Sequence, residues 1–173
     1  AVVVGRFAGR AGVLAGGVDA ALAVGAALVV YPFGTLEPLP FLAFTALSVA
    51  YAAVWVGIGV GASALVATNR RALALAVGAL VALVVVWNGL TAATEAGLAR
   101  AGITDGPLRA AAAVAAGLDP GSAFGTLAAA VDPSAPPAGA WYEGPALALP
   151  VLLGWLVGPL ALGLARFVRR DLS

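Results

Sequence analysis

Several side chains that carry chemistry in proteins are absent from this sequence of 173 residues. It has no cysteine, histidine or methionine, and all nine basic residues are arginine, so lysine is missing as well. Without cysteine there is no disulfide and no thiol nucleophile, and without histidine there is no imidazole metal ligand. A phosphate-binding loop of the Walker A type needs lysine and is excluded. The sequence therefore predicts no enzyme active site and no metal or cofactor bound by this chain.

Charge is also scarce. Only 10% of the residues are charged, whereas 62% are hydrophobic. Soluble domains carry about 25% charged residues, and a soluble fold of this length could not bury so much apolar surface. The composition therefore predicts a membrane protein with the lipid bilayer as its surroundings.

The two longest uncharged runs flank one basic turn. Residues 38–69 and 72–94 contain no charged residue, and Arg70 and Arg71 stand between them. Each run exceeds the ~20 residues that a helix needs to cross a bilayer core. An exposed turn with two guanidinium groups must lie at a membrane face, and clustered arginine in a short loop is typical of the cytoplasmic face.

The same reasoning predicts an all-α fold with four transmembrane helices in a single domain, residues 1–173. The expected spans are about 11–31, 41–67, 72–94 and 146–165. The first run has 21 residues, longer than the about 7–15 of a signal peptide, which favours a true span. Three prolines in residues 32–40 predict a loop after it.

The segment 95–144 is expected outside the cytoplasm. Asp119-Pro120 predicts a helix start, with aspartate as the cap and proline in the first turn, and Gly106-Pro107 predicts another. We expect two short helices that lie at the outer surface or dip partly into the membrane.

Counting arginines supports one orientation. Four spans with Arg70 and Arg71 inside place both chain ends in the cytoplasm. Two arginines then lie outside, Arg100 and Arg109, and seven lie inside: Arg6, Arg10, Arg70, Arg71, Arg166, Arg169 and Arg170. This distribution predicts a multi-pass protein of the cell membrane. It leaves no basic surface for nucleic acid.

Polar residues within the spans are candidates for a substrate path. Asp19 lies near the middle of the first span, where a carboxylate costs ~2.5–3.5 kcal/mol on insertion scales and should face protein or water. It is either a neutral or hydrogen-bonded interface residue or a point on a translocation path. Asn88, Thr91 and Glu95 share one helical face and either line an outward vestibule or mark a helix leaving the membrane.

A second stripe lies in the span at 41–67. Phe44, Ser48, Tyr51 and Trp55 share one face, which favours a helix–helix seam, although Tyr51 is also a candidate for a substrate-facing position. Three glycines follow in alternation, Gly57, Gly59 and Gly61. They lie inside an apolar run with no preceding strand, so they indicate close helix packing and not a nucleotide loop.

Four short motifs resemble the ABC-2 type permeases of ATP-binding-cassette exporters, especially their NosY-like branch. Gly5-Arg6 with Gly9-Arg10 is similar to the basic stretch after the family's cytoplasmic coupling segment, and the sequence from Asn69 to Leu73 is similar to a basic turn. Asp119-Pro120 with Ala123-Phe124 resembles an Asn-Pro-x-x-Ala-aromatic motif, with aspartate replacing asparagine. The ending with Phe167, Arg170, Asp171 and Leu172 matches the family's terminal Phe-x-x-Arg-Asp-Leu.

The resemblance implies a membrane subunit driven by a separate cytoplasmic ATPase, which holds ATP and Mg²⁺. It also implies a second permease subunit, as a homodimer. The four spans correspond to the third to sixth of a six-helix fold, so we expect this chain to be the C-terminal part of a longer protein. The candidate cytoplasmic contacts are Arg6, Arg10, Arg70, Arg71, Arg170 and Asp171. A membrane scaffold and an ion-coupled secondary transporter are the alternatives.

Overall fold

The protein is built from helices, which confirms the all-α class predicted from the sequence. The computed structural model describes residues 37–66 and 68–171 without a break, together with short stretches between residues 5 and 26. No strand occurs within these described residues. Within the predicted first span, residues 11–31, the described residues are helical and all lie between residues 12 and 26.

Helix α2 (Pro38–Leu65) begins earlier than the sequence predicted. Pro38 and Pro40 were expected in a loop, but both lie in the first turn of the helix. Proline is tolerated there because the first backbone N–H groups of a helix have no partner within the helix. The helix ends where Val66 adopts an extended conformation.

The next helix is continuous over 32 residues, from Asn69 to Arg100. It comprises α3 (Asn69–Leu80), a π-helical section η1 (Val81–Trp87) and α4 (Asn88–Arg100). The Thr68 hydroxyl caps its start by accepting from the Arg71 N–H at 3.4 Å. Gly102, with φ of 71°, follows its end, and the N–H of Ile103 donates to the carbonyl of Leu98. The helix therefore extends past the predicted boundary at residue 94.

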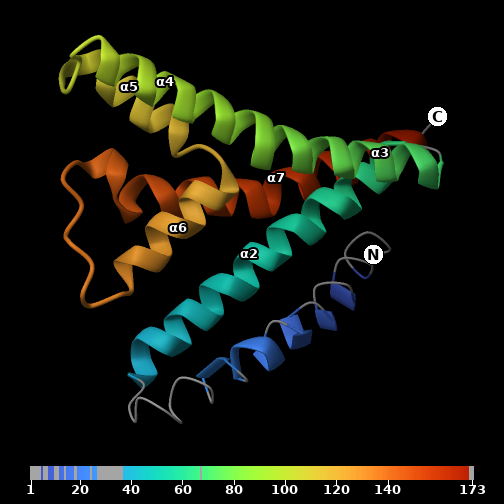
Figure 1. The fold of residues 1–173 in the computed structure, drawn as a ribbon. Helices are drawn as coiled ribbons and strands as arrows, with labels where there is room; N and C mark the ends of the chain where they lie inside the picture. Colours follow the sequence, from blue (N-terminus) through green and yellow to red (C-terminus); the bar gives the residue numbers. More distant parts are fainter. Residues whose placement is uncertain are drawn as a thin grey trace.

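The segment 95–144 contains the two short helices expected there. Helix α5 (Gly106–Ala116) is followed after three residues by α6 (Pro120–Ala130), and the turn between them points toward the middle of the molecule (Figure 1). A loop and the short helix η2 (Trp141–Glu143) lead to α7 (Pro145–Asp171).

Helices α2, α6 and α7 form the packed part of the described structure. Their shared core contains Val54, Ile58, Ala123, Leu127, Ala148 and Leu152. Helices α2 and α7 approach each other closely at Gly61, where an added Cβ would lie 2.6 Å from the carbonyl oxygen of Pro159. The close packing expected of the glycines therefore occurs at Gly61, whereas an added Cβ at Gly59 would meet nothing within 4 Å.

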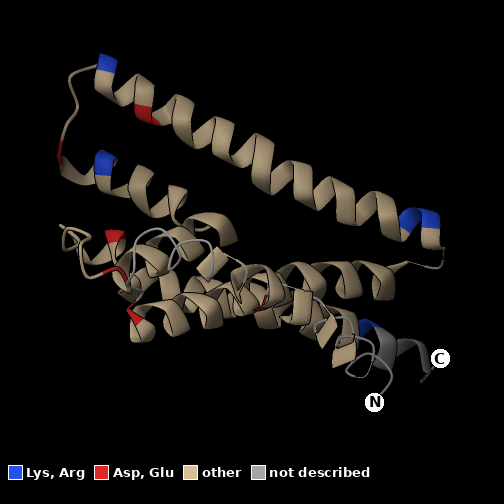
Figure 2. Cartoon of the chain, turned by 60° about the horizontal axis from the view of Figure 1, so that its bottom comes forward, with Lys and Arg blue, Asp and Glu red and all other residues tan. Residues whose placement is uncertain are grey.

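The two ends of the molecule differ in charge (Figure 2). The start of α3, with Arg70 and Arg71, lies at the same end as the last turns of α7 (Figures 1 and 2). The opposite end carries acidic residues around α5, η2 and the start of α2, together with Arg100 at the end of α4 and Arg109 on α5 (Figure 2). Acidic residues therefore gather at one end of the molecule, which we call the acidic end.

Candidate functional site

The turn between α5 and α6 is held between α2 and α7. The indole Nε1 of Trp155 on α7 donates to the carbonyl of Leu118 in this turn at 2.8 Å. Trp155 is ten residues past Pro145, so at 1.5 Å per residue the turn lies about 15 Å along α7 from its start. That distance is about half the ~30 Å thickness of a bilayer core.

Asp119, the last residue of this turn, caps α6. Its Oδ1 accepts from the backbone N–H groups of Gly121 at 2.8 Å and Ser122 at 3.1 Å, the geometry of a helix N-cap. The residue is only 3% exposed, and its Oδ2 has no hydrogen-bond partner within the described part of the chain. The sequence predicted the cap but not the burial, so a carboxylate inside the helix bundle was missed.

An aromatic column runs along the seam of α2 and α6. Phe124 of α6 stacks on Tyr51 with ring centroids 4.7 Å apart and lies 6.0 Å from Phe44. Trp55 meets the edge of Tyr51 at 6.1 Å. Such offset and edge-to-face pairs are the favourable aromatic geometries. The α2 stripe therefore packs on another helix, in agreement with the interpretation as a seam.

The structure brings Tyr51 to the buried turn. The Tyr51 hydroxyl would lie 3.6 Å from a Cβ added to Gly121, which follows the Asp119 cap by two residues. Of the predicted path residues in the long helices, Tyr51 is the one beside the buried carboxylate.

Asn88 and Thr91 are bonded to their own helix. The Asn88 side-chain amide donates to the carbonyls of Val84 at 3.0 Å and Leu83 at 3.4 Å, and Thr91 Oγ1 donates to the carbonyls of Trp87 and Asn88, each at 3.1 Å. Asn88 directly follows the π-helical section, and its amide bonds two carbonyls of that section.

Glu95 forms an ion pair with Arg109, which joins α4 to α5. Both side chains are more than a third exposed, so the pair contributes little to stability. The pair marks a point where α5 lies beside α4. Asp19, the remaining predicted path residue, lies in a helical stretch with its side chain exposed.

The predicted cytoplasmic contacts are described only in part. Arg70 and Arg71 are exposed in the first turn of α3. Arg170 and Asp171 lie in the last turn of α7. Arg6 and Arg10 are outside the described residues.

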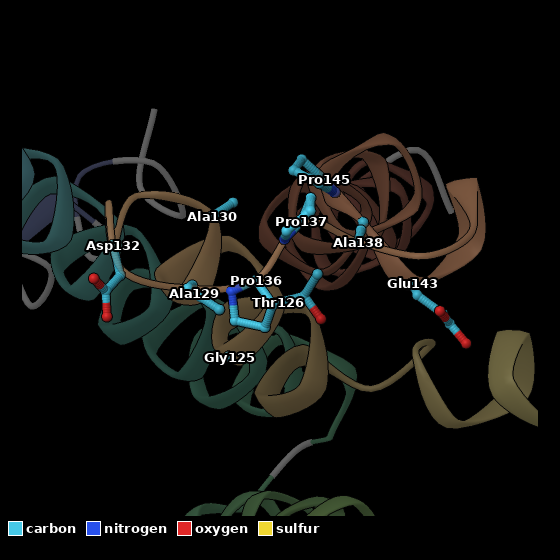
Figure 3. Close-up of a pocket in the computed structure, with 12 residues that line it drawn as sticks. Gly125, Thr126, Ala129, Ala130, Asp132, Pro136, Pro137, Ala138, Glu143 and Pro145 are labelled. Carbon is cyan, nitrogen blue, oxygen red and sulfur yellow. The ribbon is translucent and has the colours of Figure 1, made fainter.

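Two cavities open at the acidic end. One, of about 510 Å³, lies between the end of α6 and residues 135–145, with Asp132 and Glu143 on opposite sides of its lining (Figure 3). The other, of about 580 Å³, lies between the start of α2 and the end of α6 and is lined by Glu37, Pro40, Phe41, Phe44, Ala128, Val131, Asp132, Pro133 and Ser134.

Asp132 lines both cavities. Its Oδ1 accepts from the Ser134 hydroxyl at 2.7 Å and from the Ser134 N–H at 2.8 Å. These hydrogen bonds, the side-chain bond first, hold the pKa of Asp132 below its ordinary value. Asp132 is therefore a carboxylate anion at neutral pH.

The described residues contain no group of three or more acidic, histidine or cysteine side chains placed to hold a metal ion. What they contain are three helices long and apolar enough to cross a membrane, Pro38–Leu65, Asn69–Arg100 and Pro145–Arg166. These helices, together with the inserted turn and the charge polarity, define an all-α integral membrane protein.

Comparison with known families gives the particular class. The model of the ABC-2 family transporter protein matches residues 1–172, and the chain belongs to this family. It is thus a permease subunit of an ABC transporter, a membrane transport component that associates with an ABC ATPase subunit. No curated protein matches the chain. No solved structure matches it either.

Proposed function

We propose that the chain is the membrane-spanning part of an export permease, which moves a substrate out of the cytoplasm with ATP hydrolysed by a separate ATPase. The family match over residues 1–172 is the observation that carries this proposal. The chain has no lysine for a phosphate-binding loop, so ATP and Mg²⁺ are assigned to the partner subunit.

The proposed location is the cell membrane, with the arginine end in the cytoplasm and both chain ends on that side. The support is the polarity of the molecule, since Arg70 and Arg71 lie opposite the acidic end (Figure 2) and clustered arginine favours the cytoplasmic face. The acidic end, with α5 and η2, then faces outward.

The ATPase is proposed to dock at the arginine end. The candidate contacts are Arg6, Arg10, Arg70, Arg71, Arg170 and Asp171, of which Arg70 and Arg71 are exposed at the start of α3. We further propose a homodimer of permease subunits with two ATPases, and membership of the NosY-like branch. The four short motifs quoted from the sequence support the branch.

The substrate path is proposed to involve Asp19, Tyr51, Asn88, Thr91 and Glu95. Tyr51 is the best supported of them, because it stacks on Phe124 beside the buried Asp119 cap. A path along the α2–α6 seam would place cargo next to a carboxylate in the middle of the bundle.

Co-purification tests the proposal. The full-length protein carrying this chain is expected to co-purify in mild detergent with an ATP-binding-cassette protein and to show ATPase activity. Replacing Arg70 and Arg71 by alanine should weaken this association, whereas the control Arg100→Ala, at the far end of the same helix, should leave it intact. Transport driven by an ion gradient with no ATPase partner would contradict the proposal and favour a secondary transporter, with Asp19 as the first candidate ion site.

A further inference from the structure

We infer that the cavity between the start of α2 and the end of α6 binds an organic cation with an apolar body. The site consists of two carboxylates at a pocket lined by aromatic and proline side chains. The inference rests on the proposed function in one respect: the pocket is taken as the outward end of the export path.

The cavity has the size of a small-molecule site. Its volume of about 580 Å³ falls within the roughly 300–1,000 Å³ typical of ligand pockets. Its apolar surface comes from Pro40, Phe41 and Phe44 on α2 and from Ala128 and Val131 on and after α6. Because two helices and a loop contribute to it, the pocket is a product of the fold and not a feature of one segment.

The charge at the cavity has one sign. Glu37 precedes α2 and makes no capping hydrogen bond with that helix, and its side chain is exposed. Asp132 also lines the cavity, and its two hydrogen bonds come from the neutral Ser134, so they do not neutralise its negative charge. None of the nine lining residues is basic. An anionic ligand would therefore be repelled, and a cation is the complementary occupant.

The aromatic wall distinguishes an organic cation from an inorganic one. A hydrated metal ion cannot use the faces of Phe41 and Phe44, whereas a quaternary or lipophilic cation gains both apolar burial and cation–π attraction there. Phe44 is also the first ring of the column that continues through Phe124 to Tyr51. The pocket thus joins the outer end of the molecule to the α2–α6 seam.

A pair of ions with the same shape and opposite charge gives a direct test. Binding of radiolabelled tetraphenylphosphonium and tetraphenylborate would be measured on the full-length protein in nanodiscs, without nucleotide or ATPase. We expect saturable binding of the phosphonium and none of the borate. Equal saturable binding of both ions, or no saturable binding of the phosphonium, would overturn the inference.

Variants locate the site. Glu37→Gln and Asp132→Asn should each weaken phosphonium binding roughly threefold, and the double variant roughly tenfold, as expected for exposed charge pairs. Phe41→Leu keeps an apolar side chain but removes the ring face, and should weaken binding roughly threefold. Asp105→Asn is the matched control, since Asp105 is an exposed acid at the same end that makes no capping bond and does not line the cavity.

Glu37→Gln keeps the test decisive if Asp132→Asn disturbs the loop, and the thermal unfolding midpoint of each variant checks folding. Phosphonium affinity unchanged in folded Glu37→Gln and Phe41→Leu would overturn the inference.

The outcome of this binding experiment is separable from the outcome of the test of the proposed function. A protein that co-purifies with an ATPase but binds no phosphonium contradicts only the site, and one that binds phosphonium without any ATPase partner contradicts only the proposed function.

Discussion

Two regions of similar apolar composition behave differently in this molecule. The helices α2 and α7 bury residues such as Val54, which has no exposed surface, against each other and against α6. The continuous helix α3–η1–α4 leaves most of its apolar side chains exposed, for example Val85 at 62% and Leu90 at 63%. Both regions contain helices long and apolar enough to cross a bilayer.

The difference shows that hydropathy marks a membrane helix without saying what it packs against. Lipid tails are as apolar as leucine, so exposure of Val85 in a bilayer carries no hydrophobic cost. Helices associate in membranes through small residues and polar contacts, and the packed region has both: Gly61 at Pro159, and Trp155 bonded to Leu118. The exposed helix also contains small residues, but a Cβ added at Gly78, Gly89 or Gly97 would meet nothing within 4 Å, so its glycines make no such close approach.

The largest contrast is expected between two adjacent leucines of α7. Leu152→Ala should destabilise the protein by ~2–5 kcal/mol, because Leu152 is 4% exposed in the shared core and its truncation leaves a cavity. Leu153→Ala should change stability far less, since Leu153 is 50% exposed. The measurement is the free energy of unfolding of both variants in the same detergent. Equal losses of unfolding free energy in the two variants would contradict the position of the packed region.

A smaller effect with opposite signs is expected at two glycines of α2. Gly61→Ala should cost ~1–3 kcal/mol, because its Cβ meets the Pro159 carbonyl. Gly59→Ala meets nothing within 4 Å and should be neutral or stabilise by up to ~1 kcal/mol through helix propensity. A similar loss of unfolding free energy in both variants would contradict the close approach of α2 to α7 at Gly61.

The cap of α6 tests the inserted turn. Asp119→Ala should cost ~0.5–2 kcal/mol, because the N–H groups of Gly121 and Ser122 lose their acceptor. Asp119→Asn keeps a capping oxygen and should recover most of that loss. Hydrogen exchange of α6 amides would report the change, and unaltered protection in Asp119→Ala would argue against the cap.

The smallest effect is expected in the loop between α6 and η2, which contains Asp132 and Ser134. Ser134→Ala should raise the pKa of Asp132 toward its ordinary value, since the serine hydroxyl is the main cause of the lowered pKa. A carboxyl whose folded pKa is depressed stabilises the fold above its unfolded pKa, and this contribution is lost as pH falls through the folded pKa. The wild type should therefore exceed Ser134→Ala in unfolding midpoint at neutral pH, with the gap closing in acid. A gap that widened in acid would reverse this assignment.

The sequence predicted the helices better than their partners. The all-α class, the turn at Thr68 and the cap at Asp119 follow from local rules, since each depends on neighbouring residues. The π-helical section Val81–Trp87 was missed because a valine-rich run has the same composition in α and π geometry. Pro38 and Pro40 were predicted to lie in a loop, because proline is suited both to loops and to the first turn of a helix, where the structure has them.

The site was harder to predict than the fold. Burial of Asp119 depends on α2 and α7, which lie far from it in sequence, and the alanine-rich α6 carries no strong pattern that would indicate which face is covered. Glu95 was predicted as a path residue, but its ion pair with Arg109 depends on how α5 folds back on α4. The cavity at Glu37 and Asp132 joins residues about a hundred positions apart, beyond any local signal.

The orientation of the two ends is the central claim, and site-directed labelling tests it most directly. The chain has no cysteine, so single cysteines at Ser134 in the outer loop and at Asn69 beside the arginine pair can be labelled in it separately, with any other cysteine of the full-length protein removed. In intact cells a membrane-impermeant maleimide should label the cysteine at position 134, and the one at position 69 only after permeabilisation. Labelling of position 69 from outside, or of both positions from the same side, would contradict the account.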